Sequence, residues 1–141
     1  QILQEAEDGS FTGAELAQRL EHFIAENEEI IVPAGDALAA GDLEGFGRLV
    51  DRSQELTDSL LGNQVPETVA LARLARECGA AAASAVGAGF GGSVWALVEE
   101  ARTAAFLEVW SAGYAAVYPE AASRARFFTT QAGPAAFEPE G

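Results

Sequence analysis

The stretch from Gly79 to Val98, which contains no charged side chain, constrains the fold most strongly. The stretch has the length of a membrane span, but it consists mostly of Ala, Gly and Ser, and such weak hydrophobicity favours buried strands over a span. Four glycines lie within the six residues 87–92, between the apolar runs 80–86 and 93–98. We therefore expect two buried strands joined by a glycine loop.

A capping motif predicts where the first helix begins. Thr12 followed by Glu15 fits a capping box, so the helix starts near Gly13. Phe11 and Leu16 occupy the two positions of a hydrophobic staple. The apolar side chains that follow repeat with helical period and predict a buried stripe. They are Leu16, Leu20, Phe23, Ile24 and Ile31.

Proline, glycine and aspartate delimit the next helices. Pro33 and Gly35 predict a kink or a break in the first helix. Asp42 is a typical N-cap for a second helix. Pro66 suits the first turn of a third helix, which should stop at Gly79. The apolar faces are Phe46, Leu49, Val50, Leu56 and Leu60, with Ser53 beside them, in the second helix, and Leu71, Leu74, Ala75 and Cys78 in the third.

The chain after the second strand predicts one more helix of about 17 residues, which Pro119 closes. Its apolar positions are Leu107, Trp110, Tyr114 and Val117. Residues 125–130 (ARFFTT) are typical of a last strand, and the tail 131–141 is expected to be loose. Helices followed by strand, strand, helix and strand indicate an α+β fold with helices on one face of a small antiparallel sheet, in one domain over residues 1–130.

The charge balance bears on possible partners. The chain carries 22 acidic and 8 basic residues, a net charge of -14, and it contains no lysine. So acidic a surface repels phosphate backbones and anionic lipids, and we expect neither nucleic acid nor a membrane as a partner. Residues 1–10 lack the basic and apolar regions of a secretory signal, so we expect a cytoplasmic location.

Two residue counts describe the chain as a whole. It contains no methionine and begins at Gln1. Removal of the initiator explains that absence, but we expect a chain cut from something longer. The single cysteine, Cys78, cannot form an internal disulfide, and its place on an apolar helical face is typical of a small buried residue.

The glycine loop fits several kinds of site. Gly87, Gly89 and Gly92 satisfy the dinucleotide pattern G-x-G-x-x-G, but that site needs a helix to open at the third glycine, whereas residues 93–98 (SVWALV) predict a strand. The P-loop pattern fails because it needs a lysine. Two interpretations of the glycines are left open by local physics. They allow a tight turn, or they expose backbone amides to an anion or to the close approach of another backbone.

The loop together with its flanks resembles a known family. Gly87-Ala88-Gly89-Phe90-Gly91-Gly92-Ser93, followed by the run 94–98, is similar to the C-terminal glycine-rich motif of the GHMP small-molecule kinases in the form found in galactokinases. Three further segments agree in order and spacing. They are Arg19, His22, Glu26 and Asn27; Ala37 to Asp42 with Phe46 to Leu49 and Ser53; and Val65-Pro66-Glu67.

The resemblance implies the C-terminal, ferredoxin-like part of an ATP-dependent sugar kinase that uses Mg²⁺. In this family the sugar-binding motif, the catalytic aspartate and the serine-rich phosphate loop come from an N-terminal domain, and none of these motifs occurs here. The resemblance thus implies no catalytic or metal-binding residue in this chain, no tightly bound cofactor, and no activity of the chain alone. It places the glycine loop, residues 87–93, near nucleotide or sugar. A stand-alone binding module or a sugar sensor on the same scaffold is the alternative.

The chain departs from galactokinases at three places. Residues 83–86 (ASAV) stand where Ser-Arg-Met-Thr is common, Gln54 stands where a histidine is common, and Pro33 lies in a helix that is usually continuous. These departures leave the identity of the sugar open. The family also has a strand before the first helix, for which residues 1–11 are a poor candidate.

The remaining chemistry-bearing residues have structural interpretations. His22 is typical of a helix residue hydrogen-bonded at an interface rather than of a catalytic base. Trp95 and Trp110 suit core packing, with a platform for a sugar ring as the alternative. The pairs at 28–29 and 99–100, all glutamate, point in different directions and do not form an acid/base couple.

Overall fold

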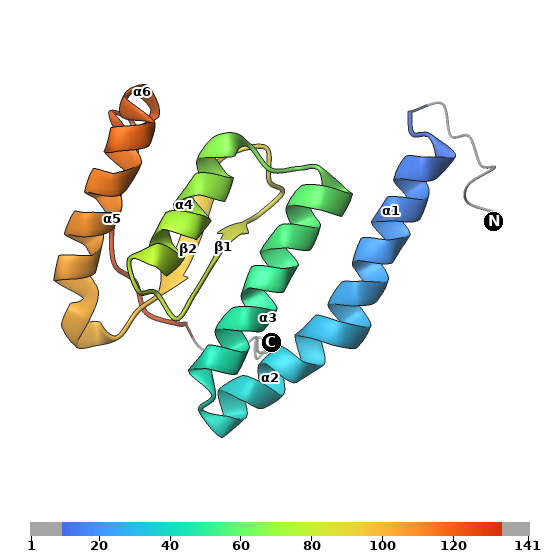
Figure 1. Cartoon of the computed structure of the whole chain (residues 1–141), viewed down its shortest axis with the longest axis horizontal. Coiled ribbons are helices and arrows are strands. Elements are labelled where there is room, and N and C mark those ends of the chain that lie inside the picture. Colours follow the sequence, from blue (N-terminus) through green and yellow to red (C-terminus); the bar gives the residue numbers. More distant parts are fainter. Residues whose placement is uncertain (1–9, 134–141) are drawn as a thin grey trace, which may run out of the picture.

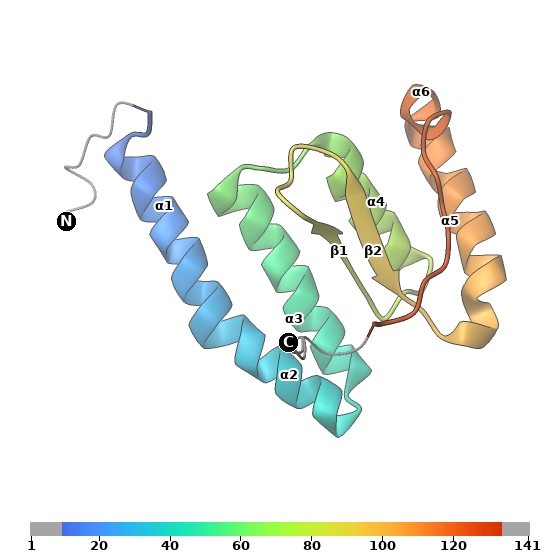
Figure 2. The same ribbon diagram turned by 180° about the vertical axis from the view of Figure 1, so that it is seen from behind.

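The computed structural model describes residues 10–133, which form a helix-rich α+β unit with one small sheet (Figure 1; Figure 2, from behind). Its α-helices are α1 (Gly13–Ile24), α2 (Ile31–Ala40), α3 (Leu43–Leu56), α4 (Pro66–Glu77), α5 (Thr103–Val117) and α6 (Pro119–Ala122). π-Helical turns continue α1 over Ala25–Ile30 and α3 over Thr57–Leu61, and a 3-10 turn, Glu100–Arg102, precedes α5. The strands are β1 (Ala82–Val86) and β2 (Ser93–Leu97).

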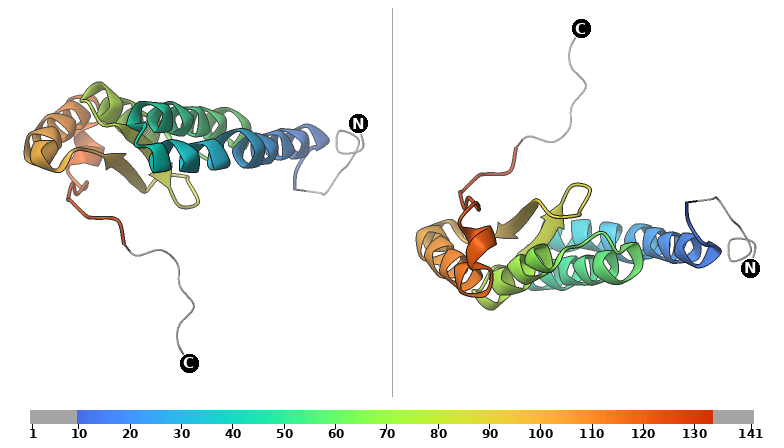
Figure 3. Two further views of the ribbon diagram at one scale, coloured as in Figure 1. Left: turned by 90° about the horizontal axis from the view of Figure 1, so that it is seen from below. Right: turned by 90° about the horizontal axis from the view of Figure 1, so that it is seen from above.

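Helices and sheet form two layers (Figure 3). The two strands pair antiparallel, from Ala82 opposite Leu97 to Val86 opposite Ser93. α3 and α4 contact β1, α4 also contacts β2, and α5 packs against α4. The predicted arrangement of helices on one face of a small antiparallel sheet is therefore confirmed, and both strands and the four main helical regions lie where the sequence predicted them.

Local capping begins the helices as predicted. The Thr12 and Glu15 capping box is formed, with the Thr12 N–H donating to the Glu15 carboxylate at 2.7 Å. Asp42 caps α3 by accepting from the Gly45 N–H at 2.8 Å. Pro66 is the first residue of α4. Because each motif acts through neighbours within one turn, these starts depend on the sequence alone.

At Pro33 the helix bends and does not break. The path from α1 to α2 is continuous in Figure 1, with a change of direction between the two. Pro33 is the third residue of α2 and has no N–H with which to continue the hydrogen-bond pattern of the preceding turn, so the helix bends there. The π-helical turn Ala25–Ile30 comes directly before α2, and such turns are a common cause of a change in helix direction.

The main core is built from small residues and an aromatic cluster. Ala75, Ala82 and Ala83 are fully buried, which lets helix and sheet approach closely. Trp110 of α5 is 7% exposed, and its ring N–H donates to the Leu71 carbonyl at 3.0 Å. Trp110 thus packs in the core, as the sequence predicted.

The prediction that the apolar stripe of the first helix is buried is wrong. Leu16 is half-buried, whereas Leu20, Phe23 and Ile31 are 44%, 61% and 56% exposed. The reason is that α1 lies at the end of the helical layer and packs along one side, against the π-helical turn Thr57–Leu61 that continues α3 (Figure 1). Phe11 is 54% exposed, so no staple is buried there.

Two predictions about the sheet also need correction. Residues 125–130 form no strand, although Phe127 packs against the core, because no strand lies beside them to complete a ladder. β2 is not buried on both faces, and Trp95 is 37% exposed on the face away from α4. In the described residues the sheet has two strands and one uncovered face.

Two expectations concern the ends of the chain. The strand sought before the first helix falls largely on residues 1–9, and most of the tail 131–141 also lies outside the described residues. The domain boundary at residue 130 stays a prediction. No helix within residues 10–133 combines the length and hydrophobicity needed to cross a bilayer.

Candidate functional site

The glycine loop, residues 87–92, joins the ends of β1 and β2 and projects from the sheet (Figure 2). Its backbone is left-handed at Gly87, Gly89, Gly91 and Gly92, with φ between 82° and 109°. Phe90 also has a positive φ of 57°, and its side chain is 77% exposed. The loop runs into strand β2, not into a helix, and this excludes the dinucleotide site that its glycine pattern suggests.

Half of this loop is held against the turn before α4. The Asn63 side chain donates from Nδ2 to the Ala88 carbonyl at 2.9 Å, and the Asn63 carbonyl accepts from the Phe90 N–H. A Cβ atom at Gly89 would lie 2.3 Å from the Asn63 carbonyl oxygen. Gly89 is therefore required for the close approach of two backbones, which the second interpretation of the glycines includes.

The other half of the loop is open. A Cβ at Gly92 would meet nothing within 4 Å, and one at Gly91 would reach only Val65, at 3.8 Å. Within residues 10–133 the N–H groups of Gly91 and Gly92 have no hydrogen-bond partner. Successive backbone N–H groups that are free in a turn can bind an anion. The other possibility within the second interpretation, exposure of amides to an anion, fits this half.

A chain of side-chain amides links the loop to the sheet. Gln64 donates to the Asn63 Oδ1 at 3.1 Å, and Gln54 donates to the Gln64 Oε1 at 3.4 Å. The Gln54 Oε1 then accepts from the Ser84 hydroxyl at 2.9 Å and from the Ala85 N–H at 2.8 Å. We call Gln54, Gln64 and Asn63 the amide relay. It connects the end of β1 with the middle of the glycine loop.

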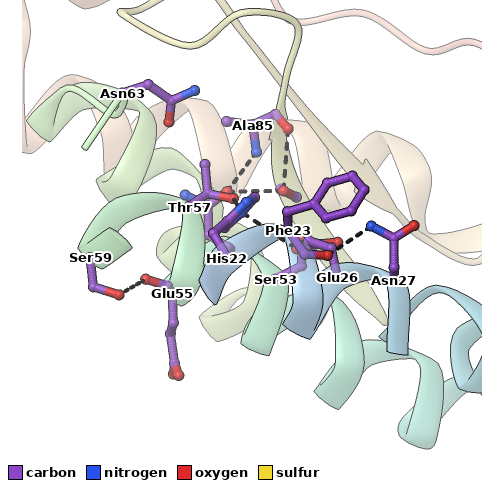
Figure 4. Close-up of polar contacts among 12 residues, drawn as sticks. His22, Phe23, Glu26, Asn27, Ser53, Glu55, Thr57, Ser59, Asn63 and Ala85 are labelled. Atoms are coloured by element: carbon purple, nitrogen blue, oxygen red, sulfur yellow. Dashed lines mark hydrogen bonds and ion pairs between the residues drawn. The ribbon is translucent and has the colours of Figure 1, made fainter. Parts of the chain in front are cut away.

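The polar residues of the first helix form a separate seam (Figure 4). His22 lies 3.3 Å from the Thr57 hydroxyl, and Ser53 donates to Glu26 at 2.6 Å. Asn27 donates to the Phe23 carbonyl one turn earlier. The prediction that His22 is hydrogen-bonded at a helix interface is confirmed. These contacts tie α1 and its π-helical turn to α3, and none of them reaches the glycine loop.

Sequence reasoning did not single out Asn63 or Gln64 for the site. Both lie in a segment whose sequence is typical of a turn. The hydrogen-bond partner of Asn63, Ala88, is 25 residues away, and that of Gln64, Gln54, lies on another helix. Gln54 was noticed only as a departure from a family pattern. No local signal identifies such residues, because their role arises from the packing of the turn against the loop.

The site can also be searched for metal ligands and for charged side chains. Within residues 10–133 no group of three or more His, Cys, Asp or Glu side chains is arranged to hold a metal ion. The glycine loop itself contains no ionisable side chain. Any charge that this segment neutralises must therefore be met by backbone dipoles.

Comparison with known proteins agrees with this geometry. Residues 36–116 match the sequence pattern of the family described as GHMP kinases C terminal. The chain belongs to the GHMP kinases. It is similar to the galactokinase of Chloroflexus aggregans, with 38% identity over 113 residues that make up 78% of this chain and 28% of the relative. It also matches the galactokinase of Exiguobacterium sibiricum, with 33% identity over 98% of this chain and 35% of the relative.

A solved structure shows the same fold. The crystal structure of Lactococcus lactis galactokinase complexed with galactose matches with a TM-score of 0.70 and 29% identity, over 83% of this chain and 32% of that one. This GHMP kinase domain therefore spans about a quarter to a third of the length of the curated galactokinases it matches. The resemblance that the loop motif indicated is confirmed at the level of family and fold.

Proposed function

We propose that this GHMP kinase domain is the C-terminal part of an ATP-dependent sugar kinase that phosphorylates galactose or a related sugar. The observation that carries the proposal is the glycine loop, whose free amides at Gly91 and Gly92 suit a phosphate, in a chain similar to galactokinases. A cytoplasmic location belongs to the proposal, because ATP is a cytoplasmic metabolite.

The contribution of this chain to such a reaction is positional. Phosphoryl transfer depends mainly on alignment of the reactants and on neutralisation of phosphate charge. Preorganised backbone N–H groups supply the second of these without reorganisation during the reaction. In this proposal the loop residues 87–93 contact nucleotide or sugar. The proton acceptor and the ligands of Mg²⁺ come from a part of the protein outside this chain, and the ion would supply charge neutralisation on the phosphates.

The test is a coupled assay of ADP release. The complete gene product should release ADP when given ATP, Mg²⁺ and galactose, and the 141-residue chain alone should release none. Turnover by the chain alone would contradict the assignment of the chemistry to another part. If the complete gene product binds galactose but releases no ADP, it is a sugar sensor on this scaffold and not a kinase.

A substitution tests the role of the loop within the active protein. Gly91 has φ 101°, which a β-branched residue does not tolerate, so Gly91→Val should lower kcat/KM by about 100-fold or more. The matched control is Gly133→Val, because Gly133 lies in exposed coil with nothing within 4 Å of a Cβ. Unchanged kinetics for Gly91→Val would remove the loop from the reaction.

A further inference from the structure

Asn63 is distinctive among the polar residues of the described chain. It is only 8% exposed, and within residues 10–133 Asn63 and Thr68 are the two buried polar residues. Three of its polar groups are engaged. Nδ2 donates to Ala88, the carbonyl accepts from Phe90, and Oδ1 accepts from Gln64. Such partners are needed because a buried amide group that lacks a hydrogen-bond partner lowers the stability of the fold by about 1–3 kcal/mol.

Two of those partners belong to the glycine loop, and the loop conformation depends on them. Phe90 has φ 57°, which costs a non-glycine residue roughly 1–2 kcal/mol. The hydrogen bond from the Phe90 N–H to Asn63 offsets that cost. Gly89 closes the contact, since its Cα hydrogen faces the Asn63 carbonyl where a methyl group would clash.

The amide relay fixes the other side of the same contact. Gln64 receives a hydrogen bond from the Thr68 hydroxyl at 3.0 Å, and Thr68 is 3% exposed in the first turn of α4. Gln54 projects from α3, and its Oε1 accepts a hydrogen bond from the backbone N–H of Ala85, just before the loop begins. The entry of the loop and its middle are thus tied to one hydrogen-bonded chain, whereas Gly91 and Gly92 are not.

From this geometry we infer that Asn63 is a positioning residue, which holds residues 88–90 as a fixed anchor so that the amides of Gly91 and Gly92 point in one direction. The inference rests on the proposed function for its catalytic consequence. The anchoring itself is a property of the fold. Asn63 does not contact substrate in this scheme. It acts through the loop backbone, and Gln54 and Gln64 keep its side chain in place.

The first test measures the anchoring by hydrogen–deuterium exchange in the complete gene product. Asn63→Asp keeps the size of the side chain but replaces the Nδ2 donor by an acceptor, which repels the Ala88 carbonyl. Exchange in peptides covering residues 87–92 should become faster by about tenfold, with exchange in α4 unchanged. Asn27→Ala is the control, because it removes the same kind of amide-to-carbonyl bond at an exposed helical site. Unchanged loop exchange in Asn63→Asp would overturn the inference.

A second variant keeps the test valid if Asn63→Asp folds poorly. Gly89→Ala leaves Asn63 intact but inserts a methyl group where the two backbones meet. Because both changes break the same contact, the double variant should exchange no faster than the more affected single variant. Fully additive effects would show that Asn63 and Gly89 do not form one anchor.

The third measurement connects the anchor to the reaction. In a gene product that releases ADP, Asn63→Asp should lower kcat per folded molecule by about tenfold while both KM values change less than about threefold, since alignment is lost and binding is kept. Faster loop exchange with an unchanged kcat would overturn the positioning role. If the unsubstituted protein releases no ADP, the proposed function fails, and the exchange experiments alone decide the anchoring.

Discussion

Single side chains determine where helices begin and how the helices are locked to the sheet. The capping box at Thr12 is formed by contacts within four residues. The Thr12 backbone N–H, and then its hydroxyl, donate to the Glu15 carboxylate and hold the pKa of that carboxyl below its ordinary value. At this scale the sequence is a sufficient guide, because both partners lie in the same turn.

The lowered pKa of Glu15 predicts a pH dependence of stability. Since the folded-state pKa lies below the unfolded one, ionised Glu15 contributes stability above about pH 4.3, and this contribution is lost as the pH falls through the lowered pKa. Glu15→Gln should therefore be less stable than the unsubstituted chain at neutral pH, with the difference disappearing in acid. Urea unfolding at several pH values measures it. A difference that persists at pH 2 would contradict the charge-based explanation.

Arg76 is a residue whose role only the packing reveals. Its guanidinium donates to both oxygens of Asp51 on α3, with Nε 2.8 Å from Oδ1, and to the carbonyls of Ala80 and Ala81 before β1. Gly47 lies against the guanidinium, since a Cβ there would be 3.0 Å from Arg76 Nη2 and 2.1 Å from the Ala81 carbonyl oxygen. One side chain thus locks α3 and α4 to the start of the sheet.

Replacement of Arg76 should therefore be costly. Arg76→Ala removes charge-assisted hydrogen bonds and leaves two backbone carbonyls without this donor, so the free energy of unfolding should fall by about 2–3 kcal/mol. Arg73→Ala on the same helix is the control, because its ion pair with Glu77 is exposed and should contribute less than about 0.5 kcal/mol. If chemical denaturation showed the same decrease in the free energy of unfolding for both variants, Arg76 would not be the residue that locks the two helices to the sheet.

At the scale of elements, the segment after α6 shows how tertiary context overrides a local pattern. Residues 125–130 have the composition of a strand, yet they run as extended coil. A cavity of about 600 Å³ lies between this segment, β2 and α5. Phe127 lines that cavity and packs edge-on against Trp110, with ring centroids 5.0 Å apart. The segment is therefore fixed by aromatic contacts of Phe127 with Trp110 and Tyr114 and not by a ladder of backbone hydrogen bonds.

That contact gives a prediction with a neighbouring control. Phe127→Ala should lower the free energy of unfolding by about 2–3 kcal/mol, because the ring packs on the aromatic core but is only half-buried. Phe128→Ala should change it by less than about 0.5 kcal/mol, since Phe128 is 74% exposed. Urea denaturation measures the free energy of unfolding of both variants. An equal decrease in the two would contradict the role of Phe127 in fixing this segment.

On the scale of the whole molecule, large apolar surfaces are uncovered. Phe23, Ile31 and Val32 are 61%, 56% and 62% exposed along α1 and α2. A groove of about 430 Å³ is lined by Ile31 and Leu38 and by Trp95 of the open sheet face. An apolar groove with exposed apolar side chains around it is typical of an interface.

These surfaces predict how the 141-residue chain behaves alone. It should self-associate as its concentration rises, because association is the way to remove the exposed side chains from water. Phe23→Ser combined with Ile31→Ser should weaken that association by about tenfold or more, as judged by sedimentation velocity. A chain that stays monomeric at the highest concentrations measured would show that the uncovered face does not associate with itself.

The sequence by itself determined the helix starts at Thr12, Asp42 and Pro66, the two strands around the glycine loop, and the family to which the loop belongs. Each of these depends on residues close together in the chain or on a motif of fixed spacing. The tertiary structure alone decided that Asn63 holds the loop, that Pro33 bends its helix without breaking it, and that the apolar stripe of α1 is exposed. The physical reason is that burial and long-range hydrogen bonds depend on which surfaces meet, and periodicity along one helix does not specify its neighbour.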